Sequence, residues 1–98
     1  MRMMMHMSIP VEAGNDAAMH GTLGSTLQKF IADVKPEAAY FVTNDQGERC
    51  GIFVFDMKDS SQLPALAEPL FMAFHARIKL QPAMNAEDLA KGLGALHK

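Results

Sequence analysis

Two runs with the pattern of strands flank a short polar turn in the middle of the chain. Residues 38–43 and 49–57 are rich in aromatic and β-branched side chains, and residues 44–48 between them are polar or glycine. Apolar runs separated by a few turn residues predict a β-hairpin. We therefore expect a hairpin over 38–57. Its register stays open, so either Tyr40 and Val42 or Phe41 and Thr43 occupy a given face.

The first residues alternate with a period of two, which predicts a strand. One face carries Met3, Met5, Met7 and Ile9. The other face carries Met4, His6 and Ser8. Since successive side chains of a strand point to opposite sides, the first set suits a core beneath helices. Pro10 ends this strand because it has no N–H to donate to a neighbour, and Asn15 or Asp16 is expected to cap the helix that follows.

Apolar residues at spacings of three and four predict a helix after this strand. The stripe consists of Leu23, Leu27, Phe30, Ile31 and Val34. Gly21 and Gly24 weaken its first turns by roughly 1 kcal/mol each relative to alanine, so the helix is expected to begin late or to fray. Lys35 precedes Pro36, and the residue before a proline is pushed out of the helical region. The helix is therefore expected to stop at Lys35.

The second half repeats the order of helix and strand. Asp59 and Gln62 have the spacing of a capping box, and the helix after it has the apolar stripe Leu63, Leu66, Ala67, Leu70 and Phe71, in which Pro69 is expected to kink or shorten the second half. A strand is expected over 75–81, with Ala76, Ile78 and Leu80 alternating with His75, Arg77 and Lys79. Asn85 and Asp88 can cap a last helix that carries Leu89, Leu93 and Leu96.

The order strand, helix, strand, strand, helix, strand predicts the α+β class. With right-handed crossovers it gives a ferredoxin-like split βαβ sandwich, a four-stranded antiparallel sheet in the order 4132, with an extra C-terminal helix. Residues 1–98 are expected to form this single domain. Both main helices cover one face of the sheet, so apolar and aromatic side chains remain on the other face. A bare apolar face on a small protein usually marks an interface.

Composition excludes several classes of partner. Of the 98 residues, 49% are hydrophobic and 20% charged, with a formal net charge of −2, so we expect no nucleic-acid partner and no basic membrane anchor. No apolar run approaches the roughly 20 residues that span a bilayer, and the methionine-rich start lacks a convincing cleavage site. The single cysteine, Cys50, excludes an internal disulfide and favours the cytoplasm.

Three segments resemble a known superfamily. They are residues 8–15 (SIPVEAGN), 35–41 (KPEAAYF) and 84–89 (MNAEDL). In this context they look like the dimeric α+β barrel superfamily, and are closer still to a group of small bacterial proteins of unassigned function. The resemblance implies a ferredoxin-like fold and a homodimer. It implies no reaction, since members include monooxygenases, lactone isomerases, haem-degrading enzymes, YciI-like proteins and stress-response proteins.

No catalytic residue of that superfamily can be carried over. The haem-degrading members use an Asn, Trp and His set, and this sequence has no Trp. A YciI-like His and Asp pair is not recognisable at a matching place. We therefore expect no cofactor, and whether the chain is an enzyme stays open.

Candidate binding residues come from two places. His6, Tyr40, His75 and Arg77 lie on strands that the sheet order brings together, where Arg77 can act as a fork for a carboxylate and a His as acid or base. The alternative is a polar rim of the sheet. Glu12 and Asn15 follow the first strand, where loops often border a cleft, although turn and capping chemistry explains Asn15 equally well.

Metal and thiol chemistry are not expected. The methionines around His6 suit Cu(I), but a strand divides them between two faces, so core methionines are the expected role. The four histidines have no zinc-motif spacing. Cys50 is expected in the core, and Arg49 is expected to pair with Glu48, Asp45 or a partner subunit rather than with a substrate.

Three functions remain on these grounds. The first is a homodimer that binds a small, possibly anionic, organic ligand in the cleft of the sheet or of the dimer. The second is a structural or regulatory module whose sheet face serves association alone. The third is a cofactor-independent isomerase or monooxygenase. An open polar pocket favours ligand binding, and a face filled by side chains favours association.

Overall fold

The computed structural model describes residues 1–97, and Lys98 lies outside the described residues. In chain order the helices and strands are β1 (Arg2–Ile9), α1 (Val11–Met19), α2 (Thr22–Val34), β2 (Ala38–Thr43), β3 (Arg49–Asp56), α3 (Leu63–Phe74), β4 (Arg77–Pro82) and α4 (Ala86–Gly94). Short 3-10 turns at Ser60–Gln62 and Ala95–His97 precede α3 and follow α4. The α+β class and the C-terminal helix are thus as the sequence predicts.

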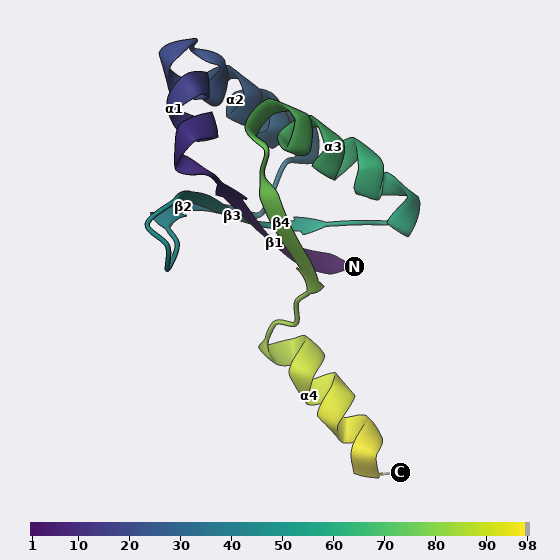
Figure 1. Cartoon of the computed structure of the whole chain (residues 1–98). Coiled ribbons are helices and arrows are strands. Elements are labelled where there is room, and N and C mark those ends of the chain that lie inside the picture. The colour runs from purple at the N-terminus through teal and green to yellow at the C-terminus, as the bar shows by residue number, and fades with distance from the viewer. Residues whose placement is uncertain (98) are drawn as a thin grey trace.

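The four strands form one antiparallel sheet in the order β2-β3-β1-β4. Read from the β4 edge, the same order is β4-β1-β3-β2. β1 is central and pairs on both sides, so that Met5 lies opposite Phe53 of β3 and Leu80 of β4. Helices α1, α2 and α3 form a layer over one face of this sheet, and the other face carries no helix layer (Figure 1). We call this second surface the free face.

The register decides which hairpin residues face which side. Phe41 and Thr43 lie opposite Gly51 and Arg49, in the set that shares the helix-covered face with the buried Met7 and Ile9. Tyr40 and Val42 therefore lie on the free face. This is the register that the alternation left undecided, because either set is apolar enough to be buried.

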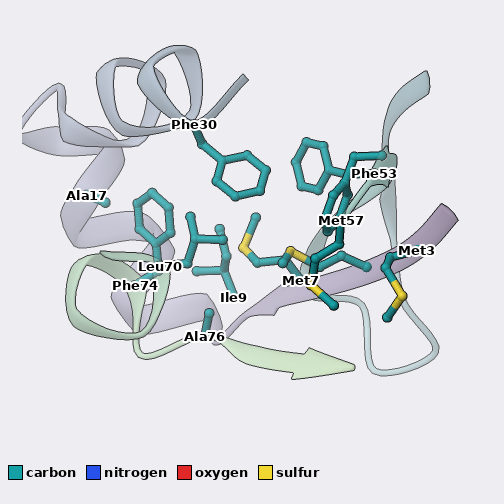
Figure 2. Packing of buried hydrophobic residues seen from close by; sticks show 12 residues of the cluster. Met3, Met7, Ile9, Ala17, Phe30, Phe53, Met57, Leu70, Phe74 and Ala76 are labelled. Carbon is teal, nitrogen blue, oxygen red and sulfur yellow. The ribbon is translucent and has the colours of Figure 1, made fainter. Parts of the chain in front are cut away.

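The core lies between the sheet and the three helices. β1 supplies Met3, Met5, Met7 and Ile9, as its alternation predicts, and these side chains are almost completely buried. Figure 2 shows Ile9 and Met7 beneath Phe30 of α2, with Met3 farther along β1 on the side of Phe53 of β3. The rings of Phe30 and Phe53 lie 4.9 Å apart, centroid to centroid, in a tilted contact. Leu70 and Phe74 of α3 close the same cluster.

The first helical region differs from the prediction, because it consists of two helices. α1 begins at Val11, directly after Pro10, and the N–H of Gly14 donates to the carbonyl oxygen of Pro10 over 2.9 Å. Proline has no N–H of its own and its fixed φ suits a helix start, and no side chain caps α1 here. The prediction that Asn15 or Asp16 caps the helix is therefore wrong, since both lie inside α1.

α2 begins after a break at Gly21. Gly21 adopts a left-handed conformation with φ of 73°, which a residue without a Cβ accepts at little cost, and α2 starts at Thr22. Lys35 ends α2 before Pro36, also in the left-handed region. The late start and the stop at Lys35 are thus as predicted.

The remaining helix ends follow the sequence, with one correction. Capping boxes form at Asp59 with Gln62 and at Asn85 with Asp88, as predicted. α3 continues through Pro69 to Phe74. His75, however, is not a strand residue, because it ends α3 in the left-handed region and its N–H donates to the carbonyl of Phe71 over 2.9 Å. The last strand therefore starts at Arg77.

α4 extends away from the sheet and its helix layer (Figure 1). Its first turn is held by the guanidinium of Arg2, which lies 3.1 Å from Asp88 Oδ2. Its leucines stay open to solvent, with Leu93 50% exposed and Leu96 in the following turn 74% exposed. The radius of gyration is accordingly 15.5 Å, whereas a compact domain of this length has about 13 Å. The free face is therefore not covered by the terminal helix of its own chain.

Candidate functional site

In its two rows nearest the hairpin turn, the free face is apolar on β2 and β3 and polar on β1 and β4. Because the strands pair in register, Tyr40, Ile52, His6 and Lys79 stand side by side across β2, β3, β1 and β4. The next row toward the hairpin turn is Val42, Cys50, Ser8 and Arg77. Polar groups thus gather on β1 and β4, and apolar groups gather on β2 and β3.

A cavity of about 530 Å³ opens at the polar end of this face. It is lined by His6, Ser8, Asn44, Gln46, Arg77, Ile78 and Lys79. β1 and β4 supply its floor, while Asn44 and Gln46 come from the turn of the β2–β3 hairpin. We call it the polar cavity. It contains imidazole, hydroxyl, amide, guanidinium and ammonium groups, which are donors suited to an anion.

The hairpin turn that borders the polar cavity is held in shape by Asn44. The Oδ1 atom of Asn44 accepts hydrogen bonds from the backbone N–H groups of Gln46 and Glu48, at 3.0 and 2.9 Å. Its Nδ2 atom donates to Glu48 Oε1 over 2.9 Å. Gly47 completes the turn with φ of 74°, in the left-handed region that favours glycine. The turn is therefore fixed before any ligand binds.

Arg77 is held by an ion pair across the sheet. Its Nη2 atom donates to Glu48 Oε2, so the side chain reaches from β4 past β1 to the start of β3. Hydrogen bonds from Arg77 and from Asn44 lower the pKa of Glu48 below its ordinary value. The Glu48 side chain is only 11% exposed, whereas that of Arg77 is 63% exposed. Arg77 thus holds a buried carboxylate and keeps further N–H donors at the cavity.

Lys79 and His6 lack such a partner. In the part of the chain that the structure describes, no carboxylate lies within ion-pair distance of either side chain. They lie opposite one another in the β1–β4 pair. The charge of Arg77 is balanced by the charge of Glu48, whereas the charge of Lys79 is not balanced by a carboxylate in the described residues. The polar cavity therefore has one excess positive charge when His6 is neutral.

Of the residues singled out from the sequence, the structure brings His6 and Arg77 together in the polar cavity. Tyr40 shares the row of His6, but Ile52 stands between them and Tyr40 does not line the cavity. His75 lies at the end of α3 and is exposed, away from these residues.

Glu12 and Asn15 lie on α1, on the helix side of the sheet. Glu12 is an exposed residue of the first turn. Asn15 Oδ1 accepts a hydrogen bond from Arg49 Nη2 over 3.1 Å. The expectation that Arg49 pairs with Glu48 or Asp45 is therefore wrong. The side chain of Arg49 lies on the helix side of the sheet, and Glu48 pairs with Arg77 on the free face.

Sequence reasoning missed five lining residues, Ser8, Asn44, Gln46, Ile78 and Lys79. The alternation already assigned Ser8 to the face of His6, and Lys79 to the face of Arg77. A rule that treats each unpaired polar side chain on a sheet face as a candidate would have found them. Asn44 and Gln46 carried no such signal, because their place depends on how the hairpin turn bends.

Metal binding finds no support in these groups. Among residues 1–97 there is no cluster of three or more His, Cys, Asp or Glu side chains able to hold an ion. Met3, Met5 and Met7 are core residues, whereas Met4 and His6 lie on the opposite face, so strand alternation separates the imidazole from the three core sulfurs. Cys50 is free and buried, with its sulfur 3.6 Å from the hydroxyl of Ser8.

The described part of the chain also contains no helix that is long and apolar enough to cross a membrane. Comparison of the chain with family models, with curated proteins and with solved structures finds no match. The structure establishes an α+β fold with a four-stranded antiparallel sheet, and the geometry of the site carries the functional argument.

Proposed function

We propose that the chain is a cytoplasmic homodimer of the dimeric α+β barrel type, which binds a small anionic organic ligand in the polar cavity. The observation that carries the proposal is the set of hydrogen-bond donors around the polar cavity, which has a volume of about 530 Å³ on the free face. This volume lies within the range of roughly 300–1,000 Å³ typical of small-molecule sites. The buried free thiol of Cys50 agrees with a reducing compartment.

Exposed apolar side chains on the free face support the homodimer. Tyr40 is 67% exposed and Val42 46% exposed, and the half-buried Met4, Ile52 and Val54 continue the same surface. A contiguous apolar surface of this kind is unfavourable in water unless a partner covers it. In a face-to-face dimer a second sheet covers these residues at a spacing of about 10 Å.

The position of the polar cavity supports a ligand at the margin of that interface. The cavity lies toward β4 and the hairpin turn, whereas the apolar side chains gather on β2 and β3. A partner sheet that covers the apolar side chains of β2 and β3 narrows the polar cavity without filling it. The ligand then sits beside the interface, where water is scarce and charge interactions are stronger.

The donors favour a carboxylate. Lys79 supplies an ammonium group without a partner carboxylate among residues 1–97, and Arg77 supplies N–H groups beyond the one that binds Glu48. The hydroxyl of Ser8 and the amide of Gln46 add neutral donors. His6 stands at the centre of the floor, where it donates to a bound anion or exchanges a proton with it.

Calorimetry and thermal shift with succinate and its neutral counterpart succinamide test the proposal. We expect succinate to bind and to raise the melting temperature by mass action, and succinamide to do neither. Lys79→Gln should weaken carboxylate binding about tenfold, since it removes a charged hydrogen-bond donor. Lys29→Gln is the matched control, because Lys29 is an exposed lysine of α2 that pairs with Asp33 outside the cavity.

Arg77 needs a double variant, because Arg77→Gln alone leaves the Glu48 carboxylate buried without its partner. The pair Arg77→Gln with Glu48→Gln removes both charges together. If Arg77 binds the ligand, this variant loses affinity and still forms the dimer. Unchanged binding of succinate in the double variant would exclude that role for Arg77.

The second candidate is an association module that binds no ligand. The observation in its favour is the apolar content of the free face, together with the exposed leucines of α4. This function predicts a dimer whose melting temperature is unaffected by succinate. The same thermal-shift series therefore separates the two functions.

A further inference from the structure

A second cavity lies on the opposite side of the sheet, between α2 and the edge strand β2. It has a volume of about 430 Å³. Its walls are mainly apolar, with Leu23 and Leu27 from α2, Phe41 from β2, and Met7 and Ile9 from β1. Arg49 also lines it. We call it the apolar cavity, and none of these residues lines the polar cavity.

Gly51 lines the floor of the apolar cavity. Gly51 lies opposite Met7 of β1 and Phe41 of β2, on the face that the helices cover. A Cβ atom at Gly51 would lie 2.8 Å from the ring of Phe53 and 3.3 Å from the end of Met7. The space directly over Gly51 is therefore occupied by Phe53 and Met7, and the cavity opens in the gap between α2 and β2. α2 does not close the space, and Phe41 stays 56% exposed.

Arg49 is the one arginine without a carboxylate partner among residues 1–97. Arg2 pairs with Glu37 and Asp88, and Arg77 pairs with Glu48. Arg49 donates from Nη2 to the neutral amide oxygen of Asn15, and its Nη1 atom lies against the Cα of Gly14, where a Cβ would come within 2.4 Å. The guanidinium is thus positioned by α1 but not neutralised by it.

We propose that the apolar cavity binds a monocarboxylate with an apolar body, such as a medium-length aliphatic chain or a single aromatic ring. The carboxylate pairs with the guanidinium of Arg49, whose planar fork matches two carboxylate oxygens. The body lies against Leu23, Leu27 and Phe41 and covers apolar surface that α2 leaves open. This inference does not rest on the proposed function, because it uses other residues on the other side of the sheet.

Octanoate and its neutral counterpart octanamide are suitable probes, measured by calorimetry on the full chain. We expect octanoate to bind and octanamide to bind roughly ten- to hundredfold more weakly, since a charge-assisted pair is lost. Arg49→Gln should reduce octanoate affinity by a similar factor. Lys79→Gln is the control for the polar cavity and should leave octanoate binding unchanged. Equal binding of the two probes, or no effect of Arg49→Gln, would overturn the proposal.

Methyl-detected NMR locates the ligand even if Arg49→Gln fails to fold. Octanoate should shift the methyl signals of Leu23 and Leu27, which line the apolar cavity. Ile52 and Val54 lie on the free face and should not respond. Shifts confined to Ile52 and Val54, or no shifts at all, would contradict the assignment. If octanoate does not bind in the apolar cavity, the proposal that Lys79 binds a carboxylate in the polar cavity is unaffected. The two proposals are therefore tested separately.

Discussion

Adding one methyl group at Gly51 should destabilise the fold, because the space at that position is already taken by the ring of Phe53. The Cβ of an alanine would stand 2.8 and 2.9 Å from Phe53 Cε2 and Cζ. Carbon atoms prefer about 3.5–4.0 Å, so the overlap is about 0.7 Å. Phe53 has little freedom to move, since it is fully buried and its ring contacts Phe30 at 4.9 Å and Phe41 at 5.7 Å.

The expected loss follows from these contacts. Overpacking of a well-filled core costs about 1–3 kcal/mol, and the lower flexibility of an unfolded chain with alanine returns about 0.4–1 kcal/mol. Gly51→Ala should therefore lower the free energy of unfolding by about 1–2 kcal/mol. For a domain of this size each kcal/mol shifts the melting temperature by about 4–8 °C, so we expect a decrease of about 4–16 °C.

Thermal unfolding followed by circular dichroism measures this decrease at a fixed protein concentration. Gly24→Ala is the matched control, because Gly24 lies inside α2 with nothing within 4 Å of an added Cβ. There alanine should stabilise the helix by about 0.5–1 kcal/mol and raise the melting temperature. A Gly51→Ala protein as stable as the wild type would refute the packing argument.

Three further predictions follow from burial and charge. Leu70→Ala should lower the free energy of unfolding by about 2–5 kcal/mol in denaturant titrations, because Leu70 of α3 is fully buried. A loss below about 1 kcal/mol would contradict its place in the core. Since Arg77 lowers the pKa of Glu48, the ionised Glu48 stabilises the fold at neutral pH, and this contribution disappears as pH falls below 4.5 through the folded pKa. Glu48→Gln should therefore be less stable than wild type at pH 7 and flatten the acid limb of the stability curve, whereas an unchanged acid limb would exclude the pair. Leu89→Ser with Leu93→Ser should leave the melting temperature of the dilute protein unchanged, because α4 extends away from the core, and a large decrease would show that α4 packs on its own domain.

Much of the fold could be predicted from the sequence, because strong local patterns specify it. The alternation of Met3, Met5, Met7 and Ile9 identified the buried face of β1, and both capping boxes identified helix starts. The sequence did not show that the first helical region is divided into two helices at Gly21. A glycine is tolerated inside a single helix as well as in the break between two helices. The start of α1 directly after Pro10 was missed, because Pro10 has no side-chain oxygen that could mark it as a cap.

The candidate site could be predicted only where alternation and strand order suffice. His6 and Arg77 were placed on one face by their parity, and both line the polar cavity. The partner of Arg77 could not be read from the sequence, because Glu48 is 29 positions away and is reached across β1. His75 was wrongly assigned to the last strand, because the residues after it alternate as in a strand. In the structure it is the residue that ends α3.

The central claim is that a second copy of the chain covers the free face. Sedimentation velocity over a series of dilutions tests it for the wild type and for Ile52→Asp. This substitution introduces a charge among the apolar side chains of β2 and β3. We expect a wild-type particle of twice 10.7 kDa and a folded monomer for Ile52→Asp. A wild-type protein that sediments as a monomer at every concentration, or a dimer that Ile52→Asp leaves intact, would contradict it.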